Sequence, residues 1–509
     1  MAIYVFSLLV GYAPNGVDYA QGYRARIFRK FPYPIQYVFT EMPRRNDIDF
    51  YNRIGIEEKE MLSMHHSFMD HPGLQLAVRA EDKLTELKDC LQITNIINNG
   101  SVIRLEKDGI AAATLVLSSE NQEYLLEAHF FSQDKLVRTE VYTDRLAYAD
   151  YFATAESDHG IFAKRTRRVY YHSDGSVSYE QIFDGEKFHY LLPDGRILTK
   201  SGFIAEFIKK LNLSEEDTVL IDRFAQFDYV QPLFQERHGA RMIAVMHAGH
   251  YFEKGESAYT VNFNQDYNYL MRYTGMIDCI VVSTQQQKEE LAEKLREYGR
   301  SVPEIRVILA GGADKLRYPD GERKPYSILS VSRIQGHKRI HWIIQSVIRA
   351  HQINEKIALD IYGSGSQDYM NALKNMVEKH HAQSYIRFMG HQNVTEVYKN
   401  YELFITASTF ETLGLSILEA VSSGNAAIGL TAKYGSRLLI HPKENGYLVD
   451  FTPGHDEEEE ERIIGDMADR IVETFEDRER LKRFQECSYV ITGGFSTWMV
   501  EEEWRELLS

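Results

Sequence analysis

Strand-like and helix-like segments alternate along the last third of this chain, and that alternation constrains its fold more than any other feature. Strand-like apolar runs occur at 326–333, 357–362, 385–388 and 403–407, and helical patterns at 340–350 and about 367–379. Alternation of this kind predicts a parallel sheet covered by helices on both faces, which is a doubly wound domain. Ligands of such domains bind beyond the carboxyl ends of the strands.

A second set of alternating segments lies between residues 200 and 310. Strand-like runs occur at 218–222, 242–246, 277–283 and 305–309, with a helical pattern at 285–300. Together with residues 1–40, they predict a second Rossmann-like domain. A chain of 509 residues exceeds one hydrophobic core, which agrees with several domains.

The middle of the chain has a different pattern, in which short alternating runs are separated by turns. Asp-Gly steps at 174–175, 184–185 and 194–195 are strong hairpin signals between such runs. We therefore expect an inserted antiparallel β-meander. Its strands carry many Tyr and Phe residues, so at least one face should be buried, either on the chain itself or against another subunit.

These patterns divide the chain into three parts. We expect the N-terminal Rossmann-like domain at 1–70 and 200–315, the meander at 71–199 and the C-terminal Rossmann-like domain at 316–489. A helix at about 490–509 is a candidate to cross back onto the N-terminal domain.

Charge and cysteine content exclude several classes of protein. The formal net charge of -16 at pH 7 argues against a nucleic-acid binder, which needs a basic surface to neutralise phosphates. The acidic run 456–461 is typical of a solvated loop or helix start. The 3 cysteines are far apart and form neither a disulfide framework nor a zinc pattern, which favours a reduced cytoplasm.

The opening residues, 1–11, are apolar but lack the positive region and cleavage site of a signal sequence, so we expect a buried first strand. No apolar run approaches membrane-spanning length. The expectation is a cytoplasmic protein with at most peripheral contact at the inner face of the cell membrane.

Two glutamates, Glu411 and Glu419, follow the strand-like run 403–407 with seven residues between them. Eight residues of helix rise about 12 Å and complete a little over two turns, so both carboxylates can face one side. One could then hold the hydroxyls of a sugar while the other holds the ribose of its nucleotide. Pairs at this spacing also arise by chance on exposed helix faces in a chain with 74 Asp and Glu residues. The context, a strand, a polar turn and a Gly-rich exit, resembles the Glu-x7-Glu signature of retaining glycosyltransferases.

Two cations follow a predicted strand, a spacing that is also common by chance but whose place at a strand's carboxyl end suits phosphate binding. Arg333 and Lys338 follow the first strand of the C-terminal domain, and together they offer a planar fork and a compact charge for a diphosphate leaving group. Gly16 closes the turn 10–16 and precedes a predicted helix, where backbone N–H groups could approach a phosphate or sugar. Glycine turns of this kind also serve packing alone.

Histidines follow two of the predicted strands. His247 and His250 follow the run 242–246, and this pattern allows three interpretations: a metal site that lacks a third ligand, a structural histidine that caps the strand, and a sugar contact by His247. His391 follows the run 385–388 and could line a nucleobase pocket. The Gly-rich turn 362–366 is predicted to be a plain loop.

Two basic patches complete the set of candidates. Arg24, Arg26, Arg29 and Lys30 are expected on an exposed helix side, or on a path for anionic partners. The cations between 164 and 168 are expected to decorate a strand.

Five motifs occur in the order found in one known family: Gly16 to Lys30, His247 to Tyr251, Ser332-Arg-x4-Lys338, Asp360 to Gly365, and Glu411-x7-Glu419. Along essentially the whole chain, the sequence resembles the GtfA-type protein O-glycosyltransferases of Gram-positive bacteria, which begin glycosylation of serine-rich-repeat adhesins. The last motifs are shared with the related wall teichoic acid glycosyltransferases. The resemblance implies two facing Rossmann-like domains of the GT-B type, with acceptor on the N-terminal side and nucleotide-sugar on the C-terminal side.

The resemblance also implies roles for individual residues. Gly16, Arg333 and Lys338 would bind the donor diphosphate. His247 and Glu411 would contact the transferred sugar, aided by backbone groups at Leu413 and Gly414, and Glu419 would hold the ribose. It implies retention of anomeric configuration and no obligatory metal or other cofactor.

The expected activity is transfer of GlcNAc or glucose from a UDP-sugar to Ser/Thr hydroxyls of an adhesin-like protein. The meander would bind a GtfB-like partner subunit or a second copy of the chain. One alternative keeps the fold and takes poly(ribitol- or glycerol-phosphate) teichoic acid as acceptor. Another is a non-catalytic subunit that only binds the acceptor.

Overall fold

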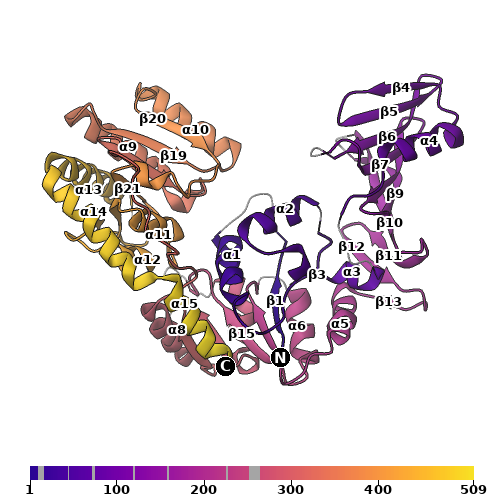
Figure 1. The fold of residues 1–509 in the computed structure, drawn as a ribbon, viewed down its shortest axis with the longest axis horizontal. Helices are drawn as coiled ribbons and strands as arrows, with labels where there is room; N and C mark the ends of the chain where they lie inside the picture. Colours follow the sequence, from indigo (N-terminus) through magenta and orange to yellow (C-terminus); the bar gives the residue numbers. More distant parts are fainter. Residues whose placement is uncertain are drawn as a thin grey trace.

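The computed structural model describes residues 1–9, 16–43, 45–70, 75–118, 121–157, 160–224, 227–251, 264–454 and 456–509. These residues form three sheets, two of them parallel and one antiparallel (Figure 1). The expected α/β fold of two Rossmann-like domains with an inserted antiparallel meander is confirmed. In Figure 1 the C-terminal domain and the antiparallel sheet lie on opposite sides of the N-terminal domain.

The N-terminal sheet has seven parallel strands in the order β17-β16-β15-β14-β1-β2-β3. Its strands are β1 Ile3–Ser7, β2 Ile35–Phe39, β3 Met61–Ser63, β14 Thr218–Ile221, β15 Arg241–Val245, β16 Cys279–Val282 and β17 Glu304–Val307. The helices that accompany them include α1 Gly16–Phe28, α2 Arg45–Ile54, α5 Lys200–Leu211, α6 Phe227–Glu236 and α8 Gln285–Glu297. The strand order reverses between β1 and β14, and ligands of such sheets bind at that switch point.

The C-terminal sheet has six parallel strands in the order β20-β19-β18-β21-β22-β23. Its strands are β18 Ser327–Val331, β19 Ala358–Tyr362, β20 Ile386–Gly390, β21 Leu403–Ile405, β22 Ala426–Leu430 and β23 Gly446–Val449. The accompanying helices are α9 Ile340–Ile353, α10 Gln367–Lys379, α11 Leu415–Ser422, α12 Gly435–Leu439 and α13 Glu457–Glu476. Here the order reverses between β18 and β21, the strands that precede Arg333 and Glu411.

The third sheet is the inserted meander, with ten antiparallel strands in the order β13 to β4. Its strands are β4 Asn95–Asn98, β5 Val102–Lys107, β6 Ile110–Leu117, β7 Leu125–Ser132, β8 Lys135–Tyr142, β9 Leu146–Ser157, β10 Gly160–Tyr171, β11 Val177–Asp184, β12 Lys187–Leu191 and β13 Ile197–Leu198. Stacked aromatic rings join it to the N-terminal domain, and the ring centroids of Tyr190 and Phe203 lie 4.0 Å apart. The expected burial of a Tyr-rich face is therefore met within the chain at this end of the sheet.

Two helices close the chain, α14 Arg478–Thr492 and α15 Thr497–Leu508. The second of these returns to the N-terminal domain, where Trp504 packs edge-on against Phe28 at 5.1 Å. Two ion pairs join the same helix to this domain. Glu501 Oε2 lies 2.6 Å from Lys30 Nζ, and Glu506 Oε1 lies 2.9 Å from Arg306 Nη1.

The acidic run before α13 is a helix start, because the Asp456 side chain accepts a hydrogen bond from the Glu459 backbone N–H at 3.0 Å. None of the helices in the described part of the chain is long and apolar enough to cross a membrane.

Candidate active site

The two sheets bring charged side chains to their switch points. Lys338 and Glu411 meet at the carboxyl ends of β18 and β21, with 2.6 Å between Lys338 Nζ and Glu411 Oε1. Lys338 Nζ also lies 3.2 Å from Ser408 Oγ. Both charged side chains are mostly buried, at 15% and 14% exposure. This partly buried pair places a cation and a carboxylate at the point where a doubly wound domain binds its ligand.

Arg333 is exposed, and in the described part of the chain its guanidinium has no hydrogen-bond or ion-pair partner. Partial desolvation lowers its pKa from 12.5, an effect that the nearby Asp18 carboxylate opposes. It remains a cation at neutral pH. The Arg333 guanidinium is therefore available to bind an anion.

The backbone around Arg333 is held by the Gly-rich turn after β19, which is not the plain loop that the sequence predicted. Ser332 N–H donates to Tyr362 O at 3.1 Å, and Ile334 N–H donates to Ser364 O at 2.8 Å. A Cβ on Gly363 would lie 1.9 Å from Ser332 O. Only glycine permits this approach, and its function here is to fix the strand end that carries Arg333.

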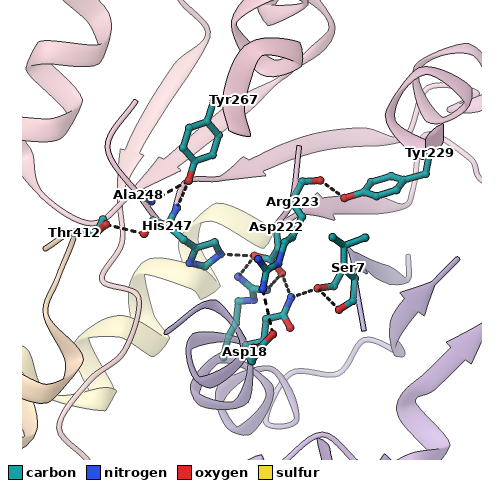
Figure 2. A network of polar contacts seen from close by, with 12 residues as sticks. Ser7, Asp18, Asp222, Arg223, Tyr229, His247, Ala248, Tyr267 and Thr412 are labelled. Carbon is teal, nitrogen blue, oxygen red and sulfur yellow. Dashed lines mark hydrogen bonds and ion pairs between the residues drawn. The ribbon is translucent and has the colours of Figure 1, made fainter. Parts of the chain in front are cut away.

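His247 follows β15 and is oriented by a buried carboxylate (Figure 2). His247 Nε2 lies 2.8 Å from Asp222 Oδ1, at the end of the neighbouring strand β14. Burial alone would raise the pKa of Asp222, but the Arg24 guanidinium and His247 hold it well below its usual range. The ionised carboxylate favours the proton on Nε2, which leaves Nδ1 for another partner.

Further hydrogen bonds fix the backbone of this histidine. The N–H groups of His247 and Ala248 both donate to Tyr267 Oη at 2.9 Å, and His247 O accepts from Thr412 Oγ1 at 2.7 Å (Figure 2). Thr412 is the neighbour of Glu411, so this last bond joins the two domains beside the Lys338–Glu411 pair. The structure thus brings His247, Lys338 and Glu411 together across the domain interface.

The expected exposed basic helix side holds for Arg26, Arg29 and Lys30, but Arg24 is an exception. It is buried, and its guanidinium forks onto both oxygens of Asp222, with 3.0 Å between Nη1 and Oδ1. Its neighbours are also engaged within the chain, as Arg26 bonds Ile54 O, Arg29 pairs with Glu60 and Lys30 pairs with Glu501. Basic and apolar residues are mixed along 24–30, and that pattern did not show that one cation would point inward.

The second basic patch decorates strand β10, as expected. Arg165 and Arg168 pair with Asp150 on β9, while Arg167 pairs with Glu180 on β11.

Glu419 lies on α11, and its Oε1 accepts a hydrogen bond from Tyr23 Oη of the N-terminal domain at 3.1 Å. Burial raises its pKa, and the hydroxyl of Tyr23 opposes that shift. Leu413 and Gly414 stand at the start of the same helix, and Gly414 has φ 79°, a backbone conformation that favours glycine. The N–H groups at such a helix start point out of the helix, and its dipole favours an anion there.

Two predicted site residues remain apart from this cluster. Gly16 begins α1 and is exposed, and a Cβ there would meet nothing within 4 Å, so packing does not require glycine at this place. The rest of its turn, 10–15, lies outside the described residues. His391 is exposed after the edge strand β20, and no hydrogen bond among the described residues joins it to the cluster.

The position of His250 agrees with the structural role that was one of the interpretations of this motif. His250 is fully buried against Tyr251 at a ring distance of 4.7 Å, and burial lowers its pKa to about 4. The described residues contain no group of three or more His, Cys, Asp or Glu side chains arranged to hold a metal ion.

Several residues of the site were missed from the sequence. Asp222 carried a readable signal, since a carboxylate directly after the buried strand β14 is a candidate by the same rule that selected Arg333. Gln21, which donates to Asp222 at 2.8 Å, and Thr412 carried none, because their partners lie far away in the sequence.

Two facing Rossmann-like domains, with cations and glutamates at the strand ends between them, define a GT-B glycosyltransferase. Models of two families match the chain, "Glycosyl transferases group 1" at residues 312–487 and "GtfA extended beta-sheet domain" at residues 94–194. The "UDP-N-acetylglucosamine--peptide N-acetylglucosaminyltransferase GtfA subunit" of Streptococcus gordonii is 31% identical over 511 residues, covering 100% of this chain and 98% of that protein. The chain belongs to the GtfA family of glycosyltransferases and is a UDP-sugar-dependent transferase.

Solved structures agree with this assignment. A crystal structure of the pneumococcal O-GlcNAc transferase GtfA in complex with UDP and GlcNAc has a TM-score of 0.91 at 31% identity, covering 100% of this chain and 98% of that one. A crystal structure of a GtfA/B complex has a TM-score of 0.87 at 30% identity, with coverage of 100% and 99%. TarM shares the fold, with a TM-score of 0.81 at 17% identity and coverage of 100% and 98%.

Proposed function

We propose that the chain transfers N-acetylglucosamine, or else glucose, from its UDP-sugar to Ser/Thr hydroxyls of a serine-rich-repeat adhesin-like protein. The observation that carries the proposal is the contact between Lys338 and Glu411 beside the free cation Arg333, with His247 across the domain interface. The names of the full-length relatives support GlcNAc as the sugar and a peptide as the acceptor.

In this proposal the cations act on the leaving group. Arg333 and Lys338 bind the donor diphosphate, together with backbone groups at Gly16 and the start of α11, and offset the charge that develops as the sugar C1–O bond to UDP breaks. The acceptor oxygen bonds to C1 on the same face, and its proton leaves with the phosphate oxygen. Two fixed cations supply the charge that a metal supplies in other transferases, so we propose no metal or other cofactor.

The remaining residues hold the donor. His247, through Nδ1, and Glu411 contact the hydroxyls of the transferred sugar, with backbone groups at Leu413 and Gly414. Glu419 holds the ribose, and His391 lines the base pocket.

We propose that a GtfB-like partner subunit, or a second copy of the chain, binds the ten-stranded sheet. Strand β10 exposes Ile161 and Phe162 at 63% and 47%, and apolar side chains at that exposure favour a protein partner. The crystal structure of a related GtfA/B complex supports the same view. The free cysteines Cys90, Cys279 and Cys487 are in keeping with reaction in the cytoplasm.

A teichoic acid acceptor has less support. Such a polyanion needs a basic groove beside the site, and several of the cations that could have formed one are engaged within the chain: Arg24 with Asp222, Arg29 with Glu60 and Arg168 with Asp150.

Intact-mass spectrometry tests the proposal. A Ser/Thr-rich fragment is incubated with each common UDP-sugar and the chain, with and without a co-expressed partner subunit. Stepwise additions of one N-acetylhexosamine or hexose mass with a single donor are the expected result. No addition with any donor, in samples that bind UDP and contain the partner, would refute the peptide acceptor.

A further inference from the structure

We propose that Glu290 is a positioning residue of the transfer reaction. It lies outside the site and fixes the positions of Glu411 and His247 relative to each other. The proposal rests on the proposed function, in which these two side chains contact the transferred sugar. Glu290 itself does not touch the Lys338–Glu411 pair. It lies on α8 of the N-terminal domain and binds the segment 433–435 of the C-terminal domain.

Glu290 spans the domain interface with both of its carboxylate oxygens. Its Oε1 lies 3.0 Å from Lys433 Nζ, and its Oε2 accepts from Tyr434 Oη at 2.8 Å. Gln286, one turn earlier on α8, donates to Oε1 at 2.9 Å and orients the carboxylate. With 18% of its side chain exposed, Glu290 makes charge-assisted bonds that are only partly screened by water.

The segment that Glu290 holds is the one that fixes Glu411. Glu411 N–H donates to Lys433 O at 2.8 Å, and Glu411 O accepts from the N–H groups of Tyr434 and Gly435 at 2.6 and 2.7 Å. Gly435 is also needed for this contact, because a Cβ there would lie 2.0 Å from Leu413 O. A shift of 433–435 therefore moves the backbone of Glu411.

The same face of α8 holds the loop that carries His247. Gln287 Nε2 donates to Ala248 O at 3.0 Å, and Glu290 Oε2 lies 3.4 Å from Tyr251 Oη. The Phe410 ring fills the space beside Gly249, where a Cβ would lie 2.8 Å from it. One helix thus holds both of the loops that must meet around the sugar.

Because of this arrangement, loss of Glu290 should have a different effect from loss of a residue that binds the UDP-sugar directly. Errors of about 1 Å in the position of a reacting group can cost on the order of 100-fold in rate. The ribose-binding residue Glu419 belongs to another contact between the domains, through Tyr23, and is not held by α8. Loss of Glu290 should slow transfer and leave UDP binding intact.

The test compares Glu290→Gln with Glu289→Gln, which makes the same chemical change on the exposed side of α8. We expect Glu290→Gln to lower kcat for sugar transfer at least tenfold with the Kd for UDP unchanged within twofold. Hydrogen exchange of the Tyr434 and Gly435 amides should become at least tenfold faster. Glu289→Gln should match the wild type in all three measurements.

The exchange measurement does not depend on any activity. If the wild type transfers no sugar, the proposed function fails, and the exchange rates still decide whether Glu290 holds the Glu411 backbone. Wild-type exchange at these amides, or wild-type kcat, in Glu290→Gln would overturn the inference. So would a loss of UDP binding equal to the loss of transfer. Lys433→Met, which removes the other half of the ion pair, should reproduce the kinetic effect, and the double variant should lose no more than either single one.

Discussion

Lys338 Nζ and Glu411 Oε1 lie 2.6 Å apart at the switch point of the C-terminal sheet, and Thr412, the next residue, binds the carbonyl of His247 in the other domain. The ion pair gives each charge a partner until a donor arrives. A diphosphate could then share the cation while sugar hydroxyls share the carboxylate.

Replacing either member of this pair should abolish most of the transfer with little effect on folding. We expect Glu411→Ala and Lys338→Met to lower kcat by about 100-fold or more, because both interactions serve charge and orientation in the transition state. Removing one member leaves the other mostly buried without its counter-charge, so some stability is lost, but both side chains keep part of their surface in water. We therefore expect a variant that still folds, with a melting temperature lower by a few degrees. Steady-state transfer and thermal unfolding check both points, and turnover near the wild-type value in Glu411→Ala would remove it from the site.

Substitutions in the buried network beneath His247 should lower both the stability of the protein and its transfer activity. Asp222→Asn leaves Arg24 buried without its counter-charge, which costs roughly 3 to 5 kcal/mol. It also removes the anion that favours the proton on His247 Nε2. The double variant Arg24→Met/Asp222→Leu should recover most of the stability and still transfer sugar slowly. Urea unfolding and initial rates distinguish the two effects, and normal rates in the double variant would show that the carboxylate only supports the fold.

The strand and helix periodicities were sufficient to predict both parallel sheets and the antiparallel insertion. They also led to Arg333, Lys338 and Glu411, because a strand's carboxyl end is visible in the sequence. Contacts between distant segments were not visible in this way. Nothing near Arg24 in the sequence shows that it pairs with Asp222, or that Tyr23 reaches Glu419.

The Gly-rich turn after β19 shows a second kind of limit. Its composition predicts a loop, and the sequence does not show which other segment comes close to it. Only the structure reveals that Gly363 and Gly365 each face a carbonyl oxygen of the Arg333 segment, at 1.9 and 2.0 Å from a hypothetical Cβ. Close backbone approach is a tertiary property, which one segment's composition does not encode.

Gly363→Ala should therefore weaken the site through Arg333. The new Cβ collides with Ser332 O, and the φ of +136° is strained for any residue with a side chain. We expect a loss of about 1 to 3 kcal/mol in the free energy of unfolding, together with a higher KM for the UDP-sugar. Gly321→Ala, where a Cβ would meet nothing within 4 Å, is the matched control and should leave both quantities unchanged. An unchanged KM in Gly363→Ala would mean that the turn does not position Arg333.

The buried His250 should make the stability of the protein depend on pH. Burial lowers its pKa from 6.5 to about 4, so between these values the unfolded chain binds a proton that the folded chain does not. The free energy of unfolding must then fall as the pH is lowered from 6.5 towards 4, by at most about 1.4 kcal/mol per pH unit from this group.

The variant His250→Leu tests this pH dependence. Both ring nitrogens of His250 lack a hydrogen-bond partner among the described residues, so the substitution removes the titrating group without leaving a neighbouring polar group unpaired. Urea unfolding at pH 7.5 and pH 5 should show a smaller difference for His250→Leu than for the wild type or for the exposed control His189→Gln. Part of the slope should persist in the variant, because burial also lowers the pKa of His65, to about 3. Equal slopes in the wild type and His250→Leu would mean that His250 is not held neutral in the folded protein.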